Sequence, residues 1–255
     1  EDFDLLESLG VGGFGEVFRA QRKQDGHICA IKSVDLEKTD PEVFQIELDQ
    51  ARQLKHPNVV RLLTAYRDET AFWLVMELYP GGDLTGEILK NNFRRDEDIK
   101  PENFMRTTPD ERESQLVLID LGVSANLKVT PILNETVGTL TTIAPELFLG
   151  DYDEKCDLWS VGMTLYMCAV CMEPWQNAKG HMSEEEMQAC LENPEWEVPY
   201  DERRWFRKSP EVTELVKQLL QRDPNVRPRA REVLATNQWI DKTGEEQPGC
   251  CGCFG

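Results

Sequence analysis

The sequence predicts an α+β fold of two lobes, an antiparallel sheet with one helix followed by a mainly helical lobe. The first third of the chain has short runs rich in Val, Ile and Phe between glycine turns. Beyond Pro80-Gly81-Gly82, apolar residues recur at helical spacing. Hydrophobic residues make up 40% of the 255 residues, which is enough for a sizeable core. We therefore predict an N-terminal lobe at residues 1–78, a C-terminal lobe at 79–241 and a flexible Cys-rich tail at 242–255.

The first lobe is expected to contain five strands and one helix. The strands are predicted at residues 3–9, 16–20, 27–34, 59–65 and 71–78. The helix begins at Asp40-Pro41, because Asp is a favoured N-cap and Pro a favoured first helical residue. It ends before His56-Pro57.

The second lobe is expected to be built mainly from helices. Helical periodicity is present at residues 83–89, 155–171, 183–192, 210–221 and 229–236. A short apolar run at residues 116–119 is predicted to be a strand.

The charge balance excludes some classes of function. Lys and Arg number 28 against 47 Asp and Glu, so the net charge is −19, a sign that repels nucleic acid and anionic lipid. No apolar window is long enough for a membrane span. The eight cysteines lack the density of a disulfide scaffold and favour a reducing compartment. We expect a cytoplasmic protein that binds no nucleic acid.

A glycine-rich motif near the N-terminus is the first candidate binding site. It reads Gly10-Val11-Gly12-Gly13-Phe14-Gly15-Glu16-Val17 and matches G-x-G-x-x-G-x-V. Missing side chains let backbone N–H groups approach phosphate oxygens closely. Taken alone, such a cluster is more often an ordinary hairpin turn.

The motifs that follow in order change this interpretation. They are Ala30-Ile31-Lys32 on a predicted strand, Glu47 on the predicted helix, Asp98-Ile99-Lys100-Pro101-Glu102-Asn103, Asp120-Leu121-Gly122 and Ala144-Pro145-Glu146. With them the chain resembles a eukaryotic protein kinase over residues 3–240. Lys100, within the D-x-K-P-E-N motif, resembles the lysine of the serine/threonine branch of this family. Several further motifs resemble the calcium/calmodulin-dependent and calcium-dependent kinase group: Tyr152-Asp153, the run 157–162, Asp223-Pro224 with Arg227-Pro228, and Gln238-Trp239-Ile240.

The resemblance implies ATP and Mg²⁺ as cofactors and gives individual residues their roles. Asp98 would accept the proton of the substrate hydroxyl, and Lys100 would neutralise charge on the transferring phosphoryl group. Asn103 and Asp120 would hold Mg²⁺. Met76 resembles the gatekeeper of the adenine pocket, Glu77 to Tyr79 the hinge, and Asp83 a contact to ribose or to a basic substrate residue. The implied nucleotide-binding residues are Gly10, Val11, Gly12, Gly13, Phe14, Gly15, Val17, Ala30, Lys32, Glu47, Met76, Glu77, Tyr79 and Asp83.

Other residues would support the C-terminal lobe. Glu146 and Arg227 resemble a buried ion pair, and Asp157 would lie at the start of the central hydrophobic helix. Regulatory phosphorylation and ordinary loop polarity are both open for the threonines between Gly122 and Ala144, namely Thr130, Thr136 and Thr139.

The chain departs from the family pattern before the catalytic loop. Asp96-Glu97 stands where the family has His-Arg, and only sixteen steps separate Gly82 from Asp98. The family places a long core helix there, and residues 90–97 are too polar to supply it. We therefore expect that one helix of the C-terminal lobe is deleted, by a splice or gene-model change or with another segment in its place.

Two main interpretations follow. The first is a serine/threonine protein kinase, a transferase that acts on protein substrates and whose activity the deletion impairs. The alternative is a catalytically dead, kinase-like nucleotide-binding scaffold. A zinc site at Cys168 and Cys171 with the tail cysteines is a third, but the helical run 155–171 explains that pair as core residues.

Two expectations concern partners and location. Asp83 and the acidic charge predict substrates with basic residues near the phosphoacceptor, with solubility as the alternative explanation of the charge. Cys250, Cys251 and Cys253 suggest lipid anchoring of the tail, against a metal-binding or functionless tail.

Overall fold

The computed structural model describes residues 2–12, 15–37, 39, 41–84, 103–110, 113–119, 133, 140–177, 180–206, 208–237 and 240. The chain falls into two compact units. The first comprises residues 1–84 with 103–126, and the second comprises residues 85–102 with 127–255. Each unit has its own hydrophobic core.

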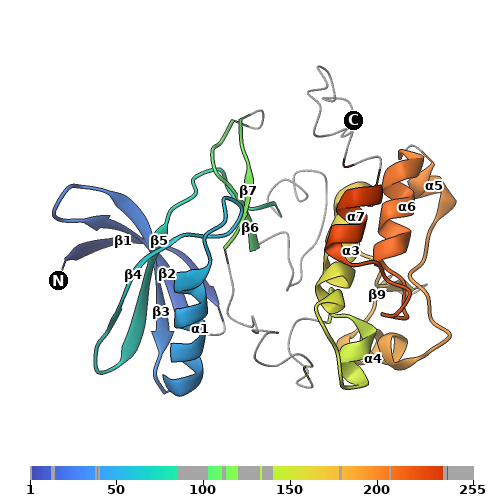
Figure 1. The fold of residues 1–255 in the computed structure, drawn as a ribbon, viewed down its shortest axis with the longest axis horizontal. Coiled ribbons are helices and arrows are strands. Elements are labelled where there is room, and N and C mark those ends of the chain that lie inside the picture. The colour runs from blue at the N-terminus through green and yellow to red at the C-terminus, as the bar shows by residue number, and fades with distance from the viewer. Residues whose placement is uncertain are drawn as a thin grey trace. The chain divides into compact units, whose positions relative to one another are not determined.

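A five-stranded antiparallel sheet forms the centre of the first unit (Figure 1). Its spatial order is β1-β2-β3-β5-β4, so β3 is paired on both sides. All five strands were predicted from the sequence, and the antiparallel sheet confirms the predicted fold class of this part. The strands are β1 (Phe3–Gly12), β2 (Gly15–Arg22), β3 (Ile28–Asp35), β4 (Leu62–Arg67) and β5 (Ala71–Glu77).

Strand β1 is longer than the sequence predicts. The prediction ends it at residue 9, but the ladder with β2 continues through Val11–Glu16 to Gly12–Gly15. Glycine has a low strand propensity. Here the cross-strand pairing outweighs that propensity, and the glycine-rich motif is the tip of a β-hairpin.

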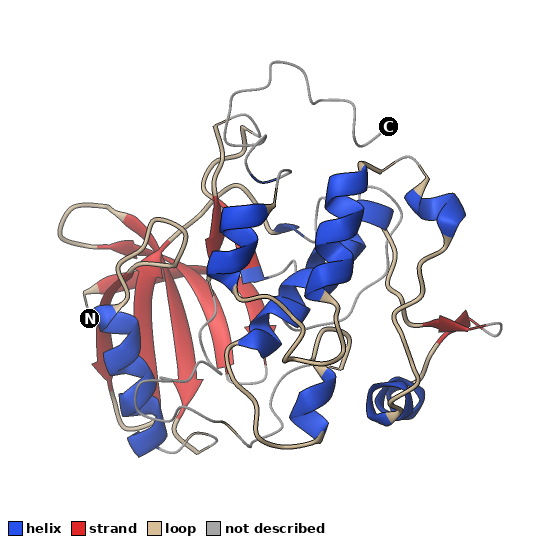
Figure 2. Ribbon diagram, turned by 45° about the vertical axis from the view of Figure 1, so that its right-hand side comes forward, coloured by secondary structure: helices blue, strands red, loops and turns tan. Residues whose placement is uncertain are grey.

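Helix α1 (Pro41–Gln53) covers one face of this sheet, as Figure 2 shows. Phe44 and Leu48 on the helix are buried against Val34 and Phe72 on the strands. The rings of Phe44 and Phe72 stack with centroids 4.0 Å apart. A second apolar cluster, made of Ala20, Cys29, Ile31 and Val75, lies on the opposite face of the sheet.

A short hairpin joins the first unit from a distant part of the sequence. It consists of β6 (Phe104–Arg106) and β7 (Leu116–Leu118), and the sequence predicts only β7. The amide of Leu118 donates to the carbonyl of Asn58 at 2.9 Å, and Val60 N donates to Leu118 O at 2.8 Å. These bonds fix the hairpin beside residues 58–60, which precede β4.

The second unit is mainly helical, which confirms the expected composition of this part of the chain. Four of its helices match predicted segments, while the short α5 and the β8–β9 hairpin were not predicted. Its elements are the 3-10 helix η2 (Pro145–Phe148), α3 (Lys155–Val170), β8 (Gln176–Asn177), β9 (Gly180–His181), α4 (Glu184–Glu192), α5 (Glu202–Trp205), α6 (Pro210–Leu219) and α7 (Ala230–Thr236).

Local signals set the ends of these helices. Ser183 caps α4 through a reciprocal pair of bonds with Glu186, and Ser209 caps α6 in front of Pro210. Cys171 ends α3 in the left-handed conformation, with φ 52°. Cys168 and Cys171 therefore belong to the end of one core helix.

Helices α3 and α6 cross at a glycine. A Cβ atom built on Gly162 would lie 2.9 Å from Leu219 Cβ and 2.9 Å from Leu220 Cδ2. A side chain there would push the two helices apart. Within the residues that the structure describes, no helix is long and apolar enough to cross a membrane.

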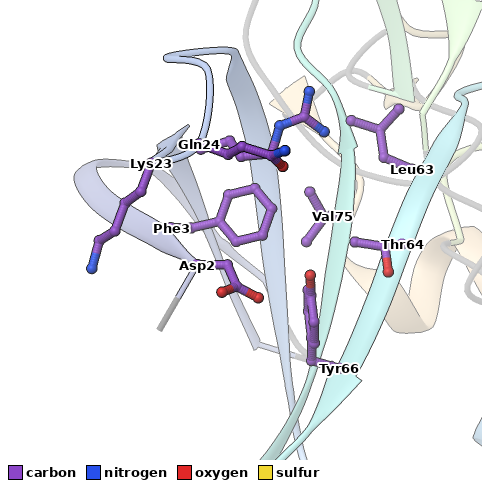
Figure 3. A pocket seen from close by; sticks show the side chains of 9 residues that line it. Asp2, Phe3, Lys23, Gln24, Leu63, Thr64, Tyr66 and Val75 are labelled. Atoms are coloured by element: carbon purple, nitrogen blue, oxygen red, sulfur yellow. The ribbon is translucent and has the colours of Figure 1, made fainter.

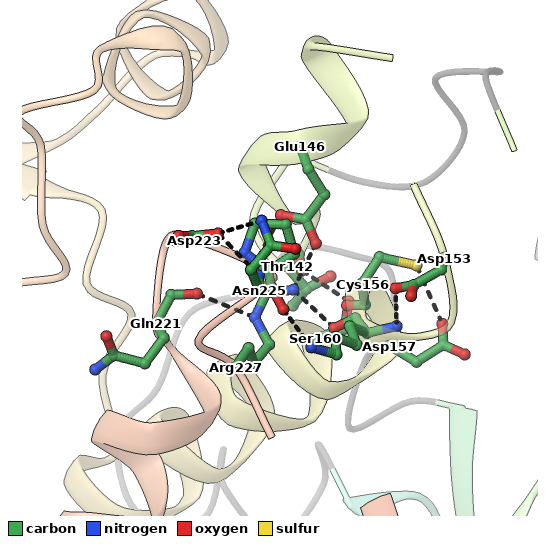
Figure 4. A network of polar contacts seen from close by, with 12 residues as sticks. Thr142, Glu146, Asp153, Cys156, Asp157, Ser160, Gln221, Asp223, Asn225 and Arg227 are labelled. Atoms are coloured by element: carbon green, nitrogen blue, oxygen red, sulfur yellow. Dashed lines mark hydrogen bonds and ion pairs between the residues drawn. The ribbon is translucent and has the colours of Figure 1, made fainter. Parts of the chain in front are cut away.

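A buried ion pair links the segment before α3 to the loop before α7, as the sequence predicts (Figure 4). Arg227 Nη1 lies 2.5 Å from Glu146 Oε1, and Arg227 Nη2 lies 3.0 Å from Glu146 Oε2. The guanidinium also donates to the carbonyls of Lys155 at 2.7 Å and Gln221 at 3.0 Å, and it stacks over Trp159. The charge of Arg227 is thus paired and its donors are satisfied.

We expect Arg227→Met to lower the free energy of unfolding by about 3–5 kcal/mol, because it leaves the Glu146 carboxylate buried without a countercharge. The measurement is urea denaturation of the whole chain. Arg203→Met is the matched control, since the Arg203 side chain is 92% exposed, and its expected effect is close to zero.

The double variant Glu146→Gln with Arg227→Met removes the orphaned charge and should recover part of the loss. Equal effects of Arg227→Met and Arg203→Met would contradict this account of the ion pair.

Candidate functional site

Lys32 lies on β3, the central strand of the sheet, and shares one face of the sheet with apolar residues of β2 and β5. Lys32 pairs with Val17 of β2 and Leu74 of β5, and Ala30 pairs with Met76. Side chains alternate between the two faces of a strand. Lys32, Ala30, Val17 and Met76 therefore share one face, which we call the Lys32 face. It offers apolar contacts beside a cation.

The glycine-rich hairpin extends from the edge of the Lys32 face. Gly10 pairs with Val17, and Val11 is 79% exposed at the tip. A Cβ atom built on Gly10 meets no atom within 4 Å, so the fold itself does not require a glycine there. This open backbone is what close approach of a ligand needs.

Helix α1 packs on the same side of the sheet as Lys32. Val34, two residues beyond Lys32 on β3, is buried against α1. Glu47 lies within this helix, between the buried residues Phe44 and Leu48. The helix thus carries Glu47, the predicted partner of Lys32. The side chain of Glu47 lies outside the described residues.

The predicted hinge follows β5 without a break. Met76 and Glu77 end the strand, and the amide of Glu77 donates to the carbonyl of Arg61 at 3.1 Å. Glu77 also forms ion pairs with His27 at 3.4 Å and Arg61 at 3.8 Å. Burial raises the pKa of the Tyr79 phenol, which therefore stays neutral at physiological pH.

The turn after the hinge is fixed to the β6–β7 hairpin. Gly81 N donates to Arg106 O at 3.0 Å, and Arg106 N donates to Gly82 O at 2.9 Å. A Cβ atom on Gly81 would lie 2.4 Å from Thr108 O, so this turn requires a glycine. Backbone hydrogen bonds therefore attach Gly81 and Gly82 to the β6–β7 hairpin.

This docking brings two predicted site residues into the first unit. Asp83 forms a β-bridge with Met105, and Asn103 directly precedes β6. The amide of Ile119 donates to the carbonyl of Asn103 at 2.9 Å. Asn103 and the end of β7 therefore lie side by side, and Asp120 is the next residue in the sequence.

Several predicted site residues lie outside the described residues. They are Gly13, Phe14, Asp98, Lys100 and Asp120, together with Thr130, Thr136 and Thr139. Their assignments stay predictions.

A shallow hollow lies on the opposite face of the sheet (Figure 3). Its volume is about 440 Å³, and Phe3, Leu63, Tyr66 and Val75 supply its apolar lining. Val75 alternates with Leu74 and Met76 along β5, so this hollow is separate from the Lys32 face. The sequence analysis did not predict it.

In the second unit, side chains hold the segment that leads to Ala144-Pro145-Glu146. Trp175 Nε1 donates to the carbonyl of Thr141 at 2.7 Å, and Ser160 Oγ donates to that of Thr142 at 2.9 Å. Both threonines are buried, at 2% and 1% exposure. The Thr142 side chain therefore lies in the core.

No described thiol stands out as a reactive group. Burial raises the pKa of Cys156 to about 12, so this thiol stays protonated and is a poor nucleophile. Among the described parts of the chain, no three His, Cys, Asp or Glu side chains gather as a metal site. Cys250, Cys251 and Cys253, which the zinc interpretation also requires, lie outside the described residues, so that interpretation stays untested.

Comparisons with known proteins give a family. The protein kinase domain family matches residues 3–97 and 92–240. Calcium-dependent protein kinase 4 of Plasmodium falciparum (isolate 3D7) is 28% identical over 269 residues, covering 94% of this chain. Calcium-dependent protein kinase 5 of the same organism is 30% identical with 92% coverage, and calcium-dependent protein kinase 12 of Arabidopsis thaliana is 29% identical with 98% coverage.

The chain spans about half the length of the curated relatives it matches. The matched parts are 49%, 44% and 56% of these three relatives. The alignment with the first relative, at 269 positions, is longer than the 255 residues of this chain. That relative therefore carries residues within the aligned region that this chain lacks.

Proposed function

The chain belongs to the protein kinase domain family, and from this premise we propose that it transfers the γ-phosphoryl group of ATP to Ser and Thr hydroxyls of proteins. The observation that carries the proposal is the Lys32 face. It places a cation beside an apolar patch, next to a glycine-rich hairpin whose backbone is open at Gly10. An adenine ring needs the apolar patch, and the phosphates need the cation and the N–H groups.

The residues of the first unit fit ATP in their chemistry. Val17, Ala30 and Met76 would contact the adenine ring, and the backbone of Glu77 to Tyr79 would read its edge. Lys32 would bind the phosphates, with Glu47 as the partner that orients it. Asp83, fixed to β6, would bind the ribose hydroxyls.

Mg²⁺ would be held by Asn103 and Asp120. Their oxygen donors suit this hard cation, whose positive charge would offset that of the ATP phosphates. The hydrogen bond from Ile119 to Asn103 supports this pairing, because it holds Asn103 beside the residue that precedes Asp120.

The transfer step would depend on Asp98 and Lys100. The Asp98 carboxylate would accept the proton of the attacking hydroxyl. Lys100 would stabilise the negative charge of the phosphoryl group in the transition state. The resemblance of the motif around Lys100 to the serine/threonine branch supports Ser and Thr, rather than Tyr, as acceptors.

The alternative is a nucleotide-binding scaffold without transferase activity. Two findings concern the deletion from which this alternative starts. The family match comes in two parts that meet at residues 92–97, inside the segment where the sequence analysis places the deletion. The aligned lengths also show that a relative has additional residues. A helix lost from the second unit would remove apolar burial worth roughly 25 cal/mol per Å².

We expect saturating Mg·ATP to raise the melting temperature of the chain by several degrees. A ligand at about 100 times its Kd stabilises the native state by about 2.7 kcal/mol. Lys32→Ala should abolish the rise. Lys23→Ala, an exposed lysine on the β2–β3 turn, is the matched control and should leave it unchanged.

Thermal unfolding followed by fluorescence or calorimetry gives the result. The absence of any shift in the parent chain would contradict both the kinase and the scaffold proposals.

We further propose that the substrates carry basic residues near the phosphoacceptor. The chain has a net charge of −19, and steering is selective for the opposite sign. A peptide array phosphorylated at low and high ionic strength should show a preference for Arg or Lys flanks that weakens with salt. A preference for acidic flanks would overturn this proposal.

The tail cysteines Cys250, Cys251 and Cys253 are proposed as acylation sites that anchor the otherwise cytoplasmic protein. Two buried acyl chains hold a protein at a membrane where one barely does. We expect the intact chain to partition into the membrane fraction of cells, and its triple Cys→Ser variant into the soluble fraction. Identical partition of both chains would refute the anchor.

A further inference from the structure

The glycine-rich hairpin is attached to β3 by a side chain. The printed sequence gives Ser33 directly after Lys32, and the ladder between β2 and β3 ends at the pair Val17–Lys32. One residue closer to the hairpin tip, Ser33 Oγ accepts a hydrogen bond from Glu16 N at 3.2 Å. The same hydroxyl donates to Glu16 O at 3.1 Å. The Ser33 hydroxyl thus replaces the next pair of backbone hydrogen bonds in the β2–β3 ladder.

A second contact supports the same attachment. Gly15 has φ +149°, and a Cβ atom built on it would lie 1.7 Å from the carbonyl oxygen of Ser33. The backbones of Gly15 and Ser33 are therefore in direct contact, and a side chain at residue 15 would break it. Gly15 and Glu16 are the first residues of β2, the strand that connects the hairpin tip to the rest of the sheet.

The hydroxyl is needed because the Glu16 backbone groups are only partly exposed. Both bonds are partly buried, and an unmade bond there costs more than one exchanged with water. A strand residue without a polar side chain would leave Glu16 N and O unsatisfied. The start of β2, at Gly15 and Glu16, would then separate from β3 more readily.

We propose that Ser33 is a positioning residue that holds the glycine-rich hairpin at a fixed place relative to Lys32. The proposal rests on the proposed function, in which the hairpin and Lys32 bind the phosphates of the same ATP. Ser33 alternates with Lys32 along β3, so its side chain lies on the opposite face and does not touch the nucleotide. Its effect is exerted through Gly15 and Glu16.

The test compares Ser33→Ala, Ser33→Thr and the parent chain. Thr64→Ala is the control, because Thr64 is a partly buried hydroxyl residue on β4, at the sheet edge away from the hairpin. Two readouts are needed: the Kd of a fluorescent ATP analogue with Mg²⁺, and hydrogen exchange of the peptide covering residues 11–17 without nucleotide.

We expect Ser33→Ala to raise the Kd about three- to tenfold, which corresponds to the loss of one or two ordinary hydrogen bonds. Exchange in residues 11–17 should become faster while the strands β4 and β5 keep their rates. Ser33→Thr keeps the hydroxyl and should restore both readouts, and Thr64→Ala should match the parent.

The outcomes separate this proposal from the proposed function. A parent chain that binds no ATP analogue refutes the function, and the exchange of residues 11–17 still decides the attachment. Unchanged exchange there in Ser33→Ala overturns the proposal. Faster exchange across the whole sheet would show a general structural role and would also overturn it.

Discussion

The pairing of β3 on both of its sides is the constraint on which the candidate site depends. Its register against β2 and β5 places Lys32, Val17, Ala30 and Met76 on one face. A slip of β3 by one residue would turn Lys32 and Ala30 to the other face, away from Val17 and Met76. The two apolar clusters prevent such a slip, because Val34 must meet α1 on one side while Ile31 packs with Val75 on the other. Burial on both faces thus fixes the position of a charged residue.

The second unit is organised by a different constraint. Arg227 brings a full charge into a core of Trp, Tyr and Met side chains, and the Glu146 carboxylate and two backbone carbonyls compensate it. Such a network adds little net stability compared with apolar residues of similar volume, but loss of one partner leaves the other buried without a countercharge. The bonds from Trp175 and Ser160 to Thr141 and Thr142 act on the segment that precedes Glu146.

The parts of this fold that the sequence predicts are those with local causes. The strands β3 and β5 follow from runs of Ile, Val and Phe, and α4 and α6 begin at serine caps. Long-range partners hide the rest. Strand β6 has three residues and exists through β7, and the role of Gly81 depends on Arg106 and Thr108. The Glu146–Arg227 pair was predictable only through resemblance to the kinase family. Nothing in the sequence indicates the two hydrogen bonds between the Ser33 hydroxyl and the Glu16 backbone.

The most direct test of the central claim is transfer of labelled γ-phosphate from ATP to protein by the purified chain. Incorporation should require Mg²⁺, appear on Ser and Thr after acid hydrolysis, and vanish in Asp98→Asn while nucleotide binding persists, because Asp98 acts in the transfer step and not in holding ATP. Binding of ATP without any incorporation in the parent chain would contradict the account and leave the nucleotide-binding scaffold as the function.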